Sequence, residues 1–83
     1  MKINLKLYAV LGQYLPDHAK KNEAEVEVED DVTLTAVLDS YGVPPENCHL
    51  VLVNGHYVAP SERTDKVMEE GDALAVWPPV AGG

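Results

Sequence analysis

In this chain of 83 residues, the spacing of apolar residues changes at one place from that of a strand to that of a helix. Apolar and polar residues alternate over residues 2–11 and again over residues 23–29, which predicts two strands with one buried face each. From Leu34 to Tyr41 the apolar residues recur at i, i+3, i+4 and i+7, which predicts one short helix. The expected architecture is therefore a sheet with a single main helix on one face.

Residues at both ends of the predicted helix suit their positions. Thr33 precedes the apolar spacing and can act as N-cap, because its hydroxyl can accept an otherwise unpaired backbone N–H. Gly42 suits the left-handed residue that follows many helices. Pro44 and Pro45 prevent continuation, so the helix should be about two to three turns long.

The second half of the chain predicts a hairpin and one more strand. Asn54-Gly55 is the dipeptide that a two-residue type I′ turn prefers, so residues 49–58 should form a hairpin. Residues 59–72 are expected to form a loop with one helical turn near Val67. Residues 73–77 predict the last strand, which ends at Pro78 because proline has no N–H to donate.

This order of elements predicts an α+β fold, a single β-grasp (ubiquitin-like) domain with a mixed sheet. The first two strands should pair antiparallel, and the last should lie parallel to the first in the centre of the sheet. A ferredoxin-like fold would need a second full helix, and residues 59–72 are too broken to form one. The domain is expected to span residues 1–78, with a flexible tail over residues 79–83. Nine residues are expected in the core: Leu5, Leu7, Val26, Val28, Leu34, Val37, Leu38, Leu74 and Val76.

Charge and hydropathy exclude several classes of protein. Fourteen acidic residues oppose six basic ones, giving a formal net charge of −8. This argues against nucleic acid and anionic membrane surfaces as partners, because both attract lysine and arginine. It favours a basic protein partner, although acidic residues also simply keep a small domain in solution. No apolar run approaches the roughly 20 residues of a membrane span, and the N-terminus lacks the apolar stretch of a signal peptide, so a cytoplasmic location is expected.

The chain also lacks the usual patterns of a metal site or an autonomous enzyme. Cys48 is the only cysteine, so it cannot form an internal disulfide or a cysteine-based metal cluster. His18, His49 and His56 are not spaced for a metal site on a helix, and no glycine-rich phosphate loop is present. Cys48 is expected to have no basic neighbour that would lower its pKa, so it should pack inertly and take no part in sulfur transfer.

The ending "WPPVAGG" has the properties of a stiff, narrow probe. Pro78 and Pro79 fix φ, so the chain should leave the sheet extended. Val80 and Ala81 are small, and Gly82 and Gly83 have no Cβ, so they can enter a channel too narrow for side chains. The sequence therefore predicts a carboxylate at Gly83 presented on a tapering tail, with Ala81 and Gly82 giving access.

Trp77 is expected to lie on the side of the sheet away from the helix. Leu74 and Val76 share one parity in the last strand, and Trp77 has the other. Residues 50–53 are apolar on both parities, so either Leu50/Leu52 or Val51/Val53 must lie on that open side too. With Tyr57, these residues predict a surface for a protein partner, together with the tail residues Pro78, Pro79 and Val80. The alternative is that Trp77 only packs over the sheet edge beside Pro78.

Three segments carry a resemblance to a known family: "VTLTAVLDSYGV", "LVLVNGHYV" and "EEGDALAVWPPVAGG". The chain resembles the ubiquitin-like sulfur carriers of the MoaD/ThiS family, which includes the small subunit of molybdopterin synthase and the thiamin sulfur carrier. The ending "PPVAGG" is the most specific part and favours the molybdopterin branch. The opening "LYAVLGQYLP" departs from that branch, which usually carries an aromatic pair and an arginine there.

The resemblance implies a carrier that is not itself an enzyme. A partner adenylyltransferase, similar to ubiquitin-activating enzymes, would join the Gly83 carboxylate to AMP from ATP. A sulfur donor would then displace AMP and leave a thiocarboxylate for delivery to a second enzyme, such as a molybdopterin synthase large subunit. ATP and AMP would bind through the activating partner, and no cofactor or metal would be bound permanently by the chain.

Two other uses of the same tail remain open at this point. A ubiquitin-like modifier would form an isopeptide between Gly83 and a lysine of a target protein. A carrier of the thiamin or another sulfur-transfer pathway would form the same thiocarboxylate for a different acceptor. All of these uses share the activation step, so the sequence does not separate them.

Overall fold

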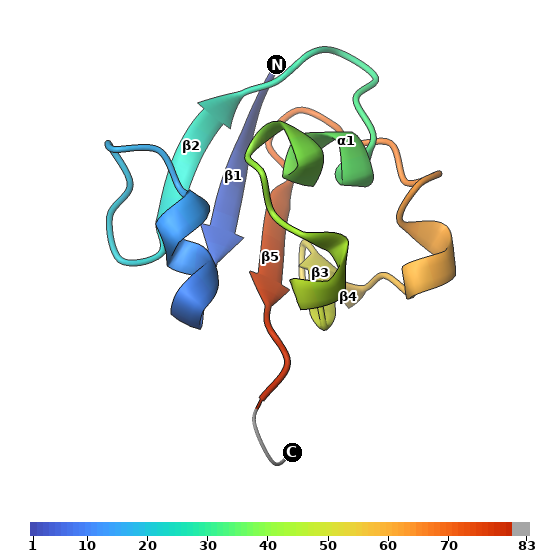
Figure 1. Cartoon of the computed structure of the whole chain (residues 1–83). Helices are drawn as coiled ribbons and strands as arrows, with labels where there is room; N and C mark the ends of the chain where they lie inside the picture. Colours follow the sequence, from blue (N-terminus) through green and yellow to red (C-terminus); the bar gives the residue numbers. More distant parts are fainter. Residues whose placement is uncertain (81–83) are drawn as a thin grey trace.

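The computed structural model describes residues 1–80, in which one α-helix packs against a face of a five-stranded sheet (Figure 1). The strands lie in the order β2-β1-β5-β3-β4. The elements are β1 (Lys2–Leu7), η1 (Ala9–Tyr14), β2 (Glu23–Glu27), α1 (Leu34–Ser40), η2 (Pro45–Asn47), β3 (Leu50–Val53), β4 (His56–Tyr57), η3 (Pro60–Glu62) and β5 (Ala73–Trp77), where η denotes a 3-10 helix.

The last strand occupies the centre of the sheet. β5 pairs parallel with β1 and antiparallel with β3, while β1 pairs antiparallel with β2. The parallel pair is possible because the chain between β1 and β5 crosses the sheet through α1. The expected β-grasp topology is therefore confirmed. The first two strands pair antiparallel, and the first and last strands of the chain pair parallel in the centre of the sheet.

The core lies between α1 and the inward face of the sheet. Leu74 and Val76 of β5 are fully buried there, opposite Leu5 and Leu7 of β1. Eight of the nine residues expected in the core are buried. Val28 is the exception: it is half-buried at the margin of the core, because β2 ends one residue earlier, at Glu27.

Both predicted ends of the helix are confirmed. The Thr33 hydroxyl accepts a hydrogen bond from the Ala36 N–H at 3.2 Å. At the other end Gly42 has a φ of +78°, a conformation that glycine adopts without steric cost. The helix is seven residues long, so its stability depends on the packing of its apolar face rather than on its own hydrogen bonds.

The predicted first strand is too long. The prediction of a strand over residues 2–11 is wrong beyond Leu7, and Ala9 is exposed instead of facing inward. Ala9 has a φ of +51°, which turns the chain into η1. The turn brings Leu11 into the core by a 3-10 helix, so the apolar alternation that looked like a strand reflects two successive elements.

The helical turn predicted near Val67 is also misplaced. Val67 forms an isolated antiparallel bridge with Thr33, and the turn lies at η3, over residues 60–62. Pro60 occupies the first turn of η3, where its missing N–H is not needed. The Glu62 carboxylate accepts the Ala59 N–H at 3.2 Å, which favours the turn at this place.

The hairpin turn is confirmed and also supports the central strand. Asn54 and Gly55 both have positive φ, 52° and 82°, as a type I′ turn requires. The Asn54 side chain donates to Asp72 at 2.8 Å and accepts the Ala73 N–H at 2.9 Å. One asparagine therefore serves the β3–β4 turn and fixes the start of β5.

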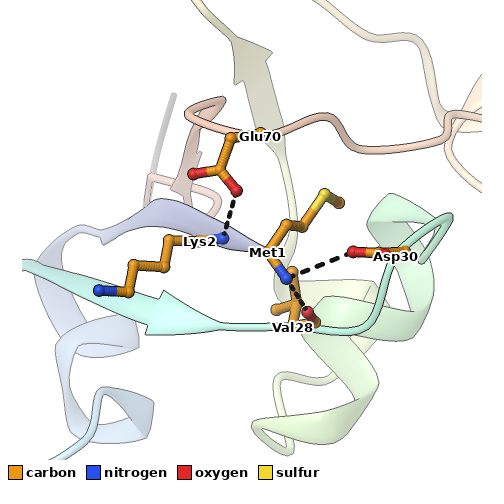
Figure 2. A network of polar contacts seen from close by, with 5 residues as sticks. All are labelled: Met1, Lys2, Val28, Asp30 and Glu70. Carbon is orange, nitrogen blue, oxygen red and sulfur yellow. Dashed lines mark hydrogen bonds and ion pairs between the residues drawn. The ribbon is translucent and has the colours of Figure 1, made fainter.

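Hydrogen bonds at the start of β1 extend the sheet past its paired strands (Figure 2). The Met1 amino group donates to the Val28 carbonyl at 2.8 Å and lies 3.4 Å from an Asp30 carboxylate oxygen. On the opposite side of β1, the Lys2 N–H donates to the Glu70 carboxylate at 3.0 Å. The Glu70 side chain thus takes the place that a backbone carbonyl would have in a longer β5.

Replacement of Leu74 by alanine should destabilise the fold strongly. Leu74 has no exposed surface and lies in the central strand under α1, so we expect Leu74→Ala to lower the free energy of unfolding by about 2–5 kcal/mol. Leu52→Ala is the matched control, because Leu52 is half-buried on the other face of the sheet. Urea unfolding of both variants measures the difference; equal losses would contradict the assignment of the two faces.

Candidate functional site

The end of β5 is held from both sides. The Tyr8 N–H donates to the Val76 carbonyl at 3.1 Å, and the His49 N–H donates to the Trp77 carbonyl at 2.9 Å. After Trp77 the chain runs away from the body of the domain, in the direction of the strand (Figure 1). Pro79 is exposed and Val80 has 73% of its surface exposed. The described chain therefore leaves the domain from the middle of the sheet.

The predicted reactive end lies outside the described residues. This applies to Ala81, Gly82 and Gly83, and with them to most of the tail predicted over residues 79–83. Their assignment as access residues and as the reacting carboxylate stays a prediction. The structure does show the segment from which they continue, Pro78–Val80, and the surface beside it.

An apolar patch lies next to this exit, on the face of the sheet away from α1. Val51 and Val53 are buried toward the helix, so Leu50 and Leu52 are the pair on the open face. Across the strands, Leu50 lies opposite Trp77, and Leu52 lies opposite Ala75 on one side and Tyr57 on the other. We call this set the apolar patch: Leu50, Leu52, Tyr57, Ala75 and Trp77. The predicted parity of Trp77 is confirmed, and Tyr57 joins it with 59% of its surface exposed.

Trp77 is stacked, an arrangement that the sequence did not suggest. Its ring lies on the ring of Tyr8, with centroids 4.5 Å apart and planes 8° from parallel. Trp77 is therefore half-buried, neither free on the sheet nor packed only against the edge beside Pro78. In the sequence, Tyr8 alternates with Lys2, Asn4 and Lys6 on the face of the first strand that points away from the helix. This position, together with the expected parallel pairing of the first and last strands, could have indicated the contact between Tyr8 and Trp77.

The rest of the open face is charged. β2 places Glu23, Glu25 and Glu27 opposite Lys6, Asn4 and Lys2 of β1. One Lys2–Glu25 pair lies at 3.9 Å, with both side chains more than half exposed, so it contributes little to stability. The open face thus has two halves. Acidic side chains of β2 and mainly basic side chains of β1 form one half, and apolar side chains of β5, β3 and β4 form the other.

Arg63 is a buried residue that sequence reasoning did not single out. Its guanidinium donates to three backbone carbonyls, those of Cys48 at 2.7 Å, Val58 at 3.2 Å and His49 at 3.3 Å. These bonds tie the segment after η3 to the two residues that lead into β3 and to the residue that follows β4. Because His49 also binds the Trp77 carbonyl, Arg63 supports one of the two contacts that hold the end of β5.

The expectation that Cys48 has no basic neighbour is wrong, because Arg63 binds its carbonyl. The distance along the sequence, 15 residues, hid this contact. Burial nevertheless raises the pKa of the Cys48 thiol; the positive charge of Arg63 opposes this rise, while Glu46 and Asp39 add to it. The thiol donates to the Pro44 carbonyl at 3.5 Å. The structure thus describes a buried thiol whose pKa is raised above its ordinary value.

The described residues also bear on metals, nucleotides and membranes. Within residues 1–80, no group of three or more histidine, cysteine or acidic side chains is arranged to hold a metal ion. A pocket of about 590 Å³ beside β4 is lined by four carboxylates, those of Glu62, Asp65, Glu69 and Asp72, and by one lysine, Lys66, so its excess of negative charge disfavours a phosphate. In the same part of the chain, no helix combines the length and apolar character needed to cross a membrane.

Cys48 should react slowly while the protein is folded. Its pKa is raised, so the folded state holds the proton more tightly than the unfolded state. We therefore expect slow alkylation by iodoacetamide in native buffer and fast alkylation in urea. The free energy of unfolding should stay constant below the ordinary pKa of cysteine and fall as the pH rises toward the raised value. Cys48→Ala should remove this fall, and its persistence would point to another group.

Solved structures share this fold over nearly all of the chain. Small archaeal modifier protein 1 from Haloferax volcanii is 26% identical, with a TM-score of 0.66 over 95% of this chain and 98% of that one. The HVO 2177 protein from the same organism is 27% identical, with a TM-score of 0.76 over 100% of this chain and 87% of that one.

A third similar structure is the complex of subunits 1 and 2 of molybdopterin-converting factor from Helicobacter pylori, in which the matching chain is 20% identical, with a TM-score of 0.59 and full coverage of both chains. At this identity the likeness shows the fold alone. These structures confirm the expected ubiquitin-like fold. No curated protein sequence matches the chain. The family model of Mut7-C ubiquitin matches residues 1–82, and the chain therefore belongs to the Mut7-C ubiquitin family.

Proposed function

We propose that this protein is a sulfur carrier. In this proposal the carboxylate of Gly83 is adenylated by a partner enzyme, converted to a thiocarboxylate and used to deliver sulfur in cofactor biosynthesis. The observation that carries the proposal is the exit of the chain: a central strand, held on both sides, directs Pro78–Val80 away from the domain beside an apolar patch.

The tail has the reach that such a reaction needs. Six residues follow Trp77 to Gly83, and an extended chain spans at most about 3.5 Å per residue, so the carboxylate can lie about 20 Å from the patch. Pro78 and Pro79 restrict φ in the first part of this span. An enzyme that holds the patch can therefore receive the carboxylate in an active site well inside its own surface.

The chemistry requires little from the chain itself. An oxygen of the Gly83 carboxylate attacks the α-phosphorus of ATP, which gives an acyl-adenylate and releases pyrophosphate. A hydrosulfide donor then attacks the acyl carbon, the bond to AMP breaks, and the thiocarboxylate remains. Magnesium, ATP and the groups that stabilise charge would be held by the partner, so no resident cofactor is proposed for the chain.

The partner surface follows from the open face of the sheet. The apolar patch offers two aromatic side chains, Tyr57 and Trp77, of the kind that often anchor interfaces. The net charge of −8 favours a partner with basic residues around its own apolar site, because opposite charges speed encounter. We therefore assign the patch, with Pro78, Pro79 and Val80, to the contact with the adenylating enzyme.

The solved structures support two uses of the tail to different degrees. The Haloferax volcanii protein, which is 26% identical to this chain, is named a modifier. This likeness supports the alternative function, in which Gly83 forms an isopeptide with a lysine of a target protein. The Helicobacter pylori complex joins two subunits of molybdopterin-converting factor, which makes a large-subunit acceptor the natural proposal for a carrier. The molybdopterin branch itself rests on the resemblance of the ending "PPVAGG".

Mass spectrometry of the protein isolated from its own cells tests the proposal. A carrier should appear as a chain that ends at Gly83, with part of the population having sulfur in place of one carboxylate oxygen. Treatment with iodoacetamide should label that form even in Cys48→Ala. Deletion of Gly82 and Gly83 is the control, and it should abolish the labelled form.

The same measurement separates the alternative. Lys66 is the last basic residue, so trypsin would leave residues 67–83 attached to a target lysine if the protein were a modifier. Such branched peptides without any thiocarboxylate would support the modifier. A native chain that continues beyond Gly83 would overturn both uses.

Tyr57→Ala should weaken binding to the adenylating enzyme without weakening the fold. Tyr57 is exposed at the far side of the patch from the tail, so its loss should cost about 1 kcal/mol or more of binding energy if it is an anchor. The enzyme can be purified by chain-dependent exchange of pyrophosphate into ATP, and calorimetry then measures affinity. Glu27→Ala, on the charged half of the same face, is the control. Unchanged affinity of Tyr57→Ala would remove the patch from the interface.

A further inference from the structure

We propose that Tyr8 is a positioning residue that sets the direction in which the tail leaves the sheet. The consequence for catalysis rests on the function proposed above, whereas the effect on the tail can be measured on the chain alone. Four features of the described residues lead to this role: the place of Tyr8 in the sheet, the turn after it, its stacked ring, and the link from Trp77 to the prolines.

The backbone of Tyr8 continues β1 by one residue. Its φ and ψ, −101° and 161°, are those of a strand, and its N–H donates to the Val76 carbonyl at 3.1 Å. Leu7 lies opposite Val76 in the parallel pair, so Tyr8 comes level with Trp77. Residues level with each other in adjacent strands point to the same face, which places both rings on the open side.

The chain turns away immediately after Tyr8. Ala9 adopts a φ of +51°, a left-handed conformation that a residue with a Cβ seldom takes. Such unfavourable conformations persist only where the surrounding structure requires them. Here the turn leads into η1, so Tyr8 is the last residue on the open face of β1. It lies beside β5, the strand from which the tail emerges.

The stacked ring restricts Trp77. With centroids 4.5 Å apart and planes within 8° of parallel, the two rings cover one face of each other. A tryptophan held in this way cannot rotate about its side-chain bonds without losing the contact. The Trp77 carbonyl is fixed as well, by the His49 N–H at 2.9 Å. Side chain and carbonyl together fix the orientation of the last residue before the prolines.

That orientation passes to the tail because Pro78 follows directly. A proline ring fixes φ, so the direction of Pro78 and Pro79 is determined largely by the residue before them. A small rotation at Trp77 would therefore be enlarged along the tail. Holding Trp77 reduces the orientations open to the carboxylate, which raises its effective concentration at the active site of a bound enzyme.

Two variants of Tyr8 separate positioning from simple stability. Within residues 1–80 the Tyr8 side chain contacts Trp77 through its ring, and its hydroxyl has no hydrogen bond to another protein group, so Tyr8→Phe keeps the stack and should behave as wild type. Tyr8→Ala keeps the backbone N–H and removes the ring. Tyr57→Ala is the control for these measurements on the isolated chain, because it removes an aromatic ring from the same face and leaves the Tyr8–Trp77 stack in place.

Measurements on the isolated chain decide the structural part. Trp77 is the only tryptophan, so its fluorescence quenching by acrylamide reports the stack directly. In Tyr8→Ala, quenching should increase, and the NMR order parameters of the Trp77 side chain and the Val80 amide should fall; the population of the wild-type orientation of the Trp77 ring should drop about three- to tenfold. Tyr8→Phe and Tyr57→Ala should leave the order of Val80 unchanged. An unchanged Val80 in a folded Tyr8→Ala would overturn the proposal.

If Tyr8→Ala does not fold, Tyr8→Leu keeps apolar bulk without a stack and takes its place, with the same expected loss of order. With the adenylating enzyme, kcat/KM for pyrophosphate exchange should fall about three- to tenfold in the ring-deleted variant and recover in Tyr8→Phe. Loss of order with an unchanged exchange rate would overturn the positioning role. Failure of any enzyme to adenylate the wild-type chain would overturn the proposed function, while the order of Val80 would still decide whether Tyr8 directs the tail.

Discussion

The pairing of β5 on both sides is the interaction on which the rest of the structure depends. β5 is the last element of the described chain, yet it lies between β1 and β3 and joins the two ends of the sequence in one sheet. Its inward residues, Leu74 and Val76, meet α1, and its outward residue Trp77 meets Tyr8. The same strand therefore completes the core and presents the tail. A chain that emerged from an edge strand would have a neighbouring strand on one side only, and its exit would not be held from both sides.

The edges of the sheet indicate where a partner can bind. At one edge, Lys20 and Glu23 exchange backbone hydrogen bonds, and a ring nitrogen of His18 lies 2.9 Å from the Glu25 carbonyl. These contacts occupy outward-facing groups of β2. At the other edge, β4 has only two residues. Both arrangements discourage strand addition, which is how many sheets avoid pairing with other chains. The open face and the tail remain as the surfaces suited to a partner.

The sequence predicted those features that depend on local chemistry. The two strand periods, the Thr33 cap, the Gly42 end and the Asn54-Gly55 turn each require only residues close together in the chain. The errors and omissions involve contacts between distant segments. The positive φ of Ala9 accompanies the burial of Leu11 in the core, which depends on residues far away in the chain. Arg63 donates to carbonyls up to 15 residues away. The Tyr8–Trp77 stack needs the register of a parallel pair separated by almost the whole chain, which no periodicity contains.

The two faces of β5 also explain why stability and recognition can change separately in this domain. Large side chains on the inward face contribute apolar burial, which dominates the free energy of so small a core. On the outward face, Ala75 lies between Lys6 and Leu52 and is itself almost buried, so the side chains around it present the exposed part of the apolar patch. Substitutions at Leu52 or Tyr57 alter what a partner meets without opening a cavity. Trp77 differs from both, because its stack on Tyr8 links the surface that a partner would bind to the direction of the chain that it would receive.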